Sequence, residues 1–127
     1  MSSKNRNNSY FVKKLSHKLV SKDKSKRGKD FIPTKEFIRG LKLSFRQGKN
    51  ISKLYSVINQ IRYGETLRES NFDHQITGSK KNQKARECHI EPNWLFLYRI
   101  SEDKNQLILI GLDVGSHNDT GMTENES

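Results

Sequence analysis

A chain of 127 residues is long enough for one compact domain with tails, but only 31% of its residues are hydrophobic, so the core must be small. It contains no apolar run of about 18 residues and no signal-peptide pattern at its N-terminus, which argues against a membrane span and predicts a cytoplasmic protein. The single cysteine, Cys88, excludes an internal disulfide, and the net charge of +10 favours a polyanionic partner such as nucleic acid, the ribosome or an acidic protein.

Residues 1–29 are expected to form a basic, flexible N-terminal arm. Within residues 1–30, ten Lys and Arg oppose two acidic residues and give a charge of +8, whereas residues 31–127 carry only +2. The arm is too polar to build a core, although a short amphipathic patch between Tyr10 and Val20 can form a helical turn or two against a partner. Two interpretations stay open, a polyanion-binding segment and a solvated tail.

Two helices are predicted between residues 34 and 64, after a short strand at Phe31–Ile32. Thr34 and Asn50 are suitable N-caps, and Gly48 and Gly64 are placed to end the helices. Apolar residues recur on one face of each helix, namely Phe37, Ile38, Leu41 and Phe45, then Ile51, Leu54, Tyr55, Ile58 and Ile61. The short connection predicts an antiparallel helical hairpin with facing apolar stripes.

Three strands are predicted at residues 85–90, 94–100 and 107–114, after a long polar loop at residues 65–84. Pro92 and Asn93 suit a tight turn, and Ser101–Asn105 form a second turn. The fold class is therefore α+β, a helical hairpin packed on a small, mostly antiparallel sheet. Residues 30–117 form the expected domain, and residues 118–127 form a flexible acidic tail.

A two-residue turn at Pro92–Asn93 predicts the pairing of the first two long strands. It pairs His89 with Phe96 and Glu87 with Tyr98, and it places Trp94 on the same surface. The opposite surface then carries Cys88, Ile90, Leu95 and Leu97. The His89 surface is either a base-stacking platform with a proton-transfer group or simply one wall of the core, and a shift of one residue would exchange the two faces.

Four histidines are candidates for chemistry: His17, His74, His89 and His117. None has the paired spacing of a metal site, and Cys88 beside His89 points to the other strand face, so no metal or other cofactor is expected. Imidazole titrates near pH 7 and suits acid–base cleavage of RNA, in which the 2′-hydroxyl is the nucleophile. The alternative is that these are ordinary surface or core histidines.

Residues 86–100, which read R-E-C-H-I-E-P-N-W-L-F-L-Y-R-I, strongly resemble the hairpin of YafQ-type toxins in the RelE/ParE superfamily, close to R-[ED]-x-H-[IV]-E-P-D-W-L-L-I-Y. Residues 73–78 resemble that family's D-H-P-L-x-G loop, and residues 115–117 resemble its terminal T-G-[ST]-H. The resemblance spans about residues 31–121.

This resemblance implies a microbial-RNase-like fold and a toxin that cleaves mRNA on the ribosome and is neutralised by a cognate antitoxin. Operator DNA is expected to be contacted only through the antitoxin. By position, the family's catalytic histidines correspond to His74, His89 and His117, with Asn93 and Glu87 as supporting residues. The positive charge and stacking surface for RNA are expected from Arg86, Lys80, Lys81, Lys84 and Trp94.

Three positions depart from the family pattern. Asn93 replaces an aspartate, Asp113 replaces an arginine, and Gly121 replaces an aromatic residue. An anion in place of a cation beside the phosphate disfavours the transition state, so the activity is expected to be reduced. One alternative is therefore a non-enzymatic member of the fold that binds an antitoxin, the ribosome or another protein target. Another is a general nucleic-acid-binding protein that acts through the arm.

Overall fold

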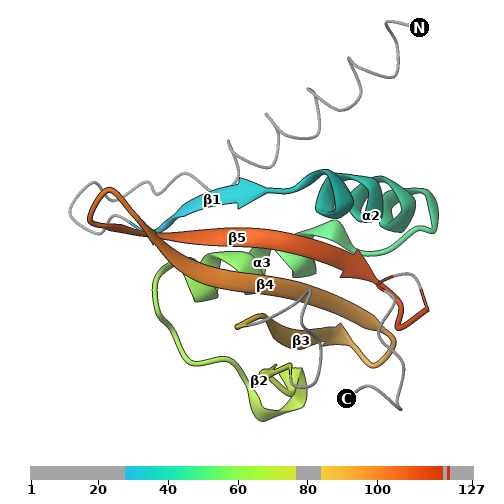
Figure 1. Ribbon diagram of the computed structural model, residues 1–127. Coiled ribbons are helices and arrows are strands. Elements are labelled where there is room, and N and C mark those ends of the chain that lie inside the picture. Colours follow the sequence, from blue (N-terminus) through green and yellow to red (C-terminus); the bar gives the residue numbers. More distant parts are fainter. Residues whose placement is uncertain (1–27, 77–83, 119, 121–127) are drawn as a thin grey trace, which may run out of the picture.

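The computed structural model describes residues 28–76, 84–118 and 120, so the predicted arm and most of the acidic tail lie outside the described residues. Two helices pack on a five-stranded sheet (Figure 1). The helices are α2 (Lys35–Arg46) and α3 (Ile51–Arg62), and the strands are β1 (Asp30–Pro33), β2 (His74–Gln75), β3 (Arg86–Glu91), β4 (Trp94–Asp103) and β5 (Gln106–Gly115). In the described part of the chain, no helix is long and apolar enough to cross a bilayer.

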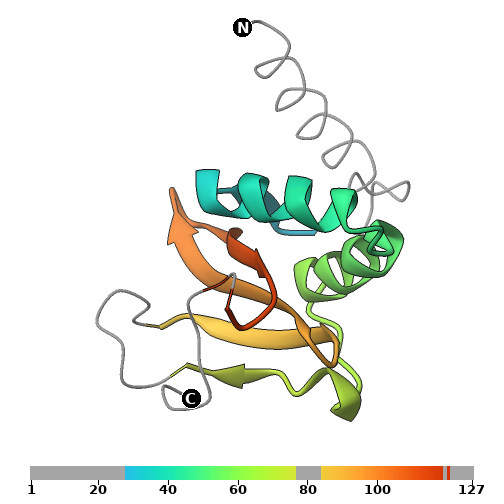
Figure 2. The same cartoon turned by 90° about the vertical axis from the view of Figure 1, so that its right-hand side faces the viewer.

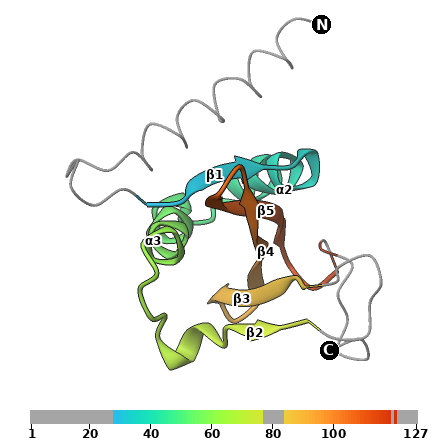
Figure 3. The ribbon, with the colours of Figure 1, turned by 60° about the vertical axis from the view of Figure 1, so that its left-hand side comes forward.

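The strand order is β1-β5-β4-β3-β2, with β1 parallel to β5 and the other neighbours antiparallel. The short strands β1 and β2 therefore lie at opposite edges of the sheet (Figure 3). This arrangement confirms the predicted α+β class with a mostly antiparallel sheet.

Both helices begin and end where the sequence predicts. The Thr34 hydroxyl accepts a hydrogen bond from the Phe37 backbone N–H at 3.2 Å, and Asn50 caps α3 through the N–H of Ser52. Gly48 and Gly64 follow the C-cap residues with φ of 77° and 70°, a region that glycine enters without the steric cost of a Cβ.

The two helices cover the same face of the sheet (Figure 2). Their buried side chains meet the aromatic residues of β4 in the main core, which also contains Cys88 and Ile90 of β3. Trp94 is 1% exposed there, and its indole N–H donates to the Ser44 hydroxyl at 2.9 Å. This bond satisfies the one polar group that the buried indole brings into the core.

The predicted register of the β3–β4 hairpin is wrong by one residue, although its Pro92–Asn93 turn is correct. Glu91 pairs with Trp94 across that turn, but His89 then pairs with Leu95 because a β-bulge at Ile90 adds one residue to β3. The faces are exchanged as a result: Trp94, Phe96 and Tyr98 share the helix-covered face with Cys88 and Ile90, whereas Glu87 and His89 share the other face with Leu95 and Leu97.

Two loops are shorter than predicted. Lys104 and Asn105 form a two-residue turn with φ of 50° and 65°, and their strands extend into the predicted turn at residues 101–105. Positive φ at both positions matches the twist of a hairpin. The predicted loop at residues 65–84 also contains a 3₁₀ turn, η1 (Glu69–Asn71), and the strand β2.

The close packing of α2 on β5 depends on Gly40. A Cβ at this position would collide with the backbone carbonyl of Val114, which a side-chain rotation cannot relieve.

We expect Gly40→Ala to lower the free energy of unfolding by about 1–3 kcal/mol in urea titrations, because the helix must move away from the strand. The neighbouring exposed variant Arg39→Ala should change it by less than about 0.5 kcal/mol, and equal effects would contradict this packing constraint.

Candidate active site

The sheet face opposite the helices carries a row of residues in register across four strands. His74 of β2 pairs with Glu87 of β3, Glu87 pairs with Leu97 of β4, and Leu97 pairs with Asp113 of β5. Directly opposed residues of neighbouring strands project to the same face, so this row places His74, Glu87 and Asp113 on one surface. His89 lies two residues along β3 from Glu87 and therefore shares that surface.

Glu87 lies at the centre of this surface. Its side chain is only 4% exposed, and its Oε1 atom lies 3.7 Å from Nε2 of His74 and 3.8 Å from Nε2 of His89. A small apolar cluster of Ile76, Ala85, Leu95 and Leu97 underlies the same surface. A carboxylate removed from water needs partners. The imidazoles of His74 and His89 lie beside the Glu87 carboxylate and can fill this role.

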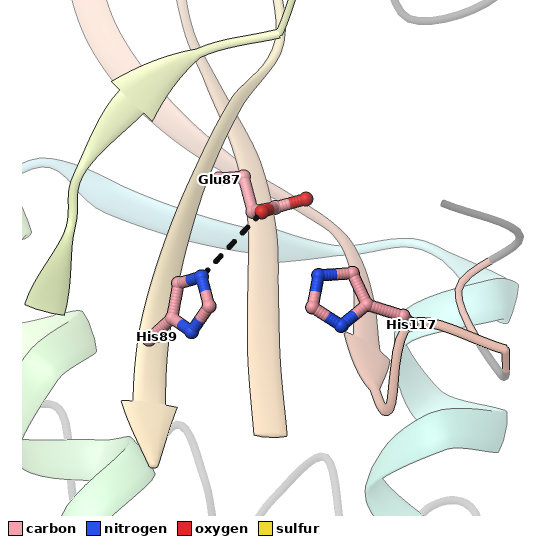
Figure 4. A group of neighbouring side chains, drawn as sticks. All are labelled: Glu87, His89 and His117. Atoms are coloured by element: carbon pink, nitrogen blue, oxygen red, sulfur yellow. Dashed lines mark ion pairs between the residues drawn. The ribbon is translucent and has the colours of Figure 1, made fainter. Parts of the chain in front are cut away.

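His117 completes the group from the segment that follows β5. Its ring centroid lies 5.9 Å from that of His89, and the two rings meet edge to face beside the Glu87 carboxylate (Figure 4). The structure thus brings together all three histidines predicted from the family motifs, from β2, β3 and the end of β5.

Two of these histidines are oriented by backbone carbonyls. Nδ1 of His74 lies 2.6 Å from the carbonyl of Phe72, and Nδ1 of His89 lies 3.2 Å from the carbonyl of Pro92. Because a carbonyl only accepts, Nδ1–H is the donor in both bonds, and Nε2 is the nitrogen directed at Glu87. Each ring therefore presents Nε2 to the Glu87 carboxylate.

Arg86, predicted to bind the RNA backbone, is engaged on the other face of the sheet. It pairs with Tyr98 across β3 and β4, and its guanidinium donates two hydrogen bonds of 3.1 and 3.2 Å to Asp73. The Tyr98 hydroxyl donates to the same carboxylate at 2.6 Å. These hydrogen bonds to Asp73 raise the pKa of Arg86, whose charge is balanced away from the histidines.

The other predicted RNA-binding residues are dispersed. Lys84 is exposed just before β3 with φ of 64°, and Lys80 and Lys81 lie outside the described residues. Asn93 is exposed in the β3–β4 turn. The prediction that Trp94 lies beside His89 is wrong, because the bulge at Ile90 turns its ring into the helix-covered core.

Donor atoms of Glu87, His89 and His117 all lie within 4.8 Å of one another, which is close enough for one metal ion. Carboxylate oxygen and imidazole nitrogen are ligands of divalent transition metals. The prediction of no metal site relied on spacing within the sequence, and that criterion overlooks ligands brought together from separate elements.

Sequence reasoning missed the contribution of η1 and the residue after it. The Asn71 side chain donates to the backbone carbonyl of His89 at 2.7 Å, and the ring of Phe72 contacts the His89 ring at a centroid distance of 5.5 Å. The sequence signal that could have found this contribution is Phe72, a single aromatic residue within the polar segment 65–84.

The family of bacterial toxins of type II toxin–antitoxin systems described as YafQ matches residues 29–121. The chain belongs to this family. It is thus the toxin of a type II toxin–antitoxin system, as the motifs predicted. A search of curated protein sequences gave no match.

Solved structures of other bacterial toxins share the fold. A copper-bound mutant toxin from Helicobacter pylori is 31% identical with a TM-score of 0.63, over 71% of this chain and 96% of that chain. A metal-bound toxin from the same organism is 30% identical with a TM-score of 0.60, over the same shares. Escherichia coli YafQ in the DinJ-YafQ toxin–antitoxin complex is 23% identical with a TM-score of 0.61, over 72% of this chain and 94% of that chain.

Stability should depend on pH in the alkaline range because of two buried groups. Burial raises the pKa of Cys88 above its ordinary 9.0, and burial together with the hydrogen bond to Asp73 raises that of Tyr98 above 10.0. The folded toxin keeps both protons where the unfolded chain loses them, so this stabilisation is complete below about pH 9 and is lost as the pH rises further. Above these values, the free energy of unfolding should fall by up to about 1.4 kcal/mol per pH unit for each group.

Urea unfolding between about pH 8 and 11 measures this slope, with Cys88→Ala and Tyr98→Phe as variants that each remove one titrating group. Each variant should show a shallower fall than the wild-type chain, whatever its stability at neutral pH. Slopes equal to that of the wild type would show that Cys88 and Tyr98 do not cause the alkaline loss of stability.

Proposed function

We propose that this toxin is an endoribonuclease that cleaves mRNA on the ribosome by acid–base catalysis at the Glu87–histidine cluster. The observation that carries the proposal is the grouping of His74, His89 and His117 around one buried carboxylate on the sheet face opposite the helices. Membership of the YafQ family of toxins supports it as well.

RNA supplies its own nucleophile, so the site needs a base for the 2′-hydroxyl proton, an acid for the leaving 5′-oxygen and positive charge for the phosphate. Attack of the 2′-oxygen on phosphorus forms a 2′,3′-cyclic phosphate and releases the 5′-oxygen, which takes a proton from the acid. Donor atoms of His89 and His117 lie within 4.8 Å of each other, so both rings can reach oxygens of one phosphate. With Arg86 bound to Asp73, we assign the positive charge to imidazolium and to the exposed Lys84.

The proposed partners follow from membership of the YafQ family of type II toxins. Escherichia coli YafQ is seen in complex with the antitoxin DinJ, and we propose that a cognate antitoxin neutralises this toxin and makes any contact with operator DNA. Ribosomes carrying mRNA are the proposed target, which places the toxin in the cytoplasm. The net charge of +10 supports binding to ribosomal RNA that weakens as salt rises.

A second candidate is a toxin that binds without cleaving. Asp113 lies in the same sheet row as Glu87, and Arg86 is paired on the opposite face, so the histidine surface has two carboxylates and lacks the guanidinium that the motif predicted. Growth arrest with intact mRNA in primer-extension assays would favour this candidate over cleavage.

Removal of two histidines tests the mechanism. Expression of the wild-type toxin without its antitoxin should stop growth and cleave translated mRNA, and the double variant His89→Ala/His117→Ala should lose both effects. Primer extension on a translated reporter mRNA measures cleavage, and His17→Ala is the control, because His17 matches none of the family motifs. Undiminished cleavage by the double variant would rule out histidine catalysis.

Restoring the family residues should raise the activity. Asp113→Arg exchanges an anion for a cation on the histidine surface, and Asn93→Asp restores a carboxylate beside it. We expect Asp113→Arg to speed mRNA cleavage about 10- to 100-fold, measured by single-turnover cleavage on purified ribosomes, because it stabilises the developing phosphate charge. The exposed variant Asp103→Arg controls for charge alone, and equal acceleration by both variants would contradict a local effect.

A further inference from the structure

Phe72 occupies a backbone conformation that aromatic residues rarely adopt. It has φ of 46° and ψ of 46°, in the left-handed region where a Cβ and a bulky side chain cost energy. Two hydrogen bonds hold this conformation: the Phe72 N–H donates to the carbonyl of Glu69, and Asn71 donates from its side chain to the carbonyl of His89. The η1 turn is thereby fixed to β3.

This conformation presents the Phe72 ring outside the core. The residue is 64% exposed, the most exposed of the large hydrophobic residues described, yet its ring edge contacts the ring of His89. Single exposed hydrophobic residues are common on protein surfaces, so what distinguishes Phe72 is its contact with a histidine of the cluster. The contact with His89 places the ring at the margin of the histidine cluster.

A cavity of about 600 Å³ opens beside Phe72 and His89. Its lining includes Lys53 from the start of α3 and Lys49, the residue before the N-cap of that helix. Lys53 forms an exposed ion pair with Glu91 at 3.2 Å, so the lining has two cations against one carboxylate, besides His89. Pro92 and Asn93 of the β3–β4 turn also line the cavity.

An aromatic ring, amide groups and ammonium groups around one cavity are the elements that bind a nucleotide. Bases stack on aromatic side chains, amides hydrogen-bond to base edges, and lysines balance phosphate. We infer that Phe72 and this cavity form a nucleotide subsite, in which Phe72 stacks on one base of single-stranded RNA next to the phosphate held at the histidines. This inference rests on the proposed function, since it names where that substrate lies.

The test measures RNA binding separately from cleavage. The full chain, free of antitoxin, is titrated into a short single-stranded oligoribonucleotide that is 2′-O-methylated throughout and carries 2-aminopurine at each position in turn. Stacking on Phe72 should quench the fluorescence at one position of the bound RNA. Phe72→Ala should remove that quenching and weaken binding about 5- to 150-fold, and Phe72→Trp should restore both.

Phe45→Ala is the matched control, because Phe45 is 57% exposed on α2, and it should bind the oligonucleotide as the wild type does. Thermal unfolding checks that Phe72→Ala is folded. Unchanged RNA affinity in Phe72→Ala would overturn the subsite, as would equal losses in the two alanine variants. Weaker antitoxin binding with unchanged RNA binding would also overturn it, by identifying the exposed ring as an antitoxin contact.

The proposed function fails independently of the subsite. If wild-type toxin leaves translated mRNA intact but quenches 2-aminopurine through Phe72, the subsite stands and cleavage does not. If wild-type and Phe72→Ala toxins cleave mRNA equally fast and bind the oligonucleotide equally well, cleavage stands and the subsite is overturned.

Discussion

One extra residue in β3 determines the chemistry of both faces of the sheet. The bulge at Ile90 lets Cys88 and Ile90 face the helices while Glu87 and His89 face outward. Without the bulge, the alternation fixed at the Pro92–Asn93 turn would place the histidine opposite Phe96 and beneath α2 and α3. The bulge therefore supplies a polar surface from the same strand that completes an apolar core.

The charges of the toxin domain are separated by the same sheet. On the helix-covered side, Asp73 holds Arg86 and Tyr98 together through three hydrogen bonds. On the other side, Glu87 lies beside the imidazoles of His74 and His89. The guanidinium of Arg86 thus joins β3 to the segment before β2, and the histidines lie on the opposite face of the same strand.

The features that the sequence predicted correctly are local ones. Both helices were located from caps and apolar periodicity, because Thr34, Asn50 and the following glycines act within a few residues of themselves. The register of β3 was predicted wrongly, since no local signal in the sequence marks the bulge, which places Ile90 in the core with residues of both helices. A strand as short as β2 has no periodicity to detect, and periodicity cannot show that Arg86 faces Asp73. The histidine grouping was accessible only through the family resemblance, while the stacking position of Phe72 depends on a left-handed backbone that no pattern encodes.

The two outermost strands of the sheet have a further consequence for the free toxin. β1 has four residues and ends in Pro33, which has no N–H, and β2 has only two, whereas β4 and β5 have ten each. The long strands lie inside the sheet, and the two edge strands themselves offer few backbone groups to a strand from another molecule. Pairing of two such chains through β1 or β2 would therefore add only a few hydrogen bonds, which disfavours edge-to-edge association at these two strands.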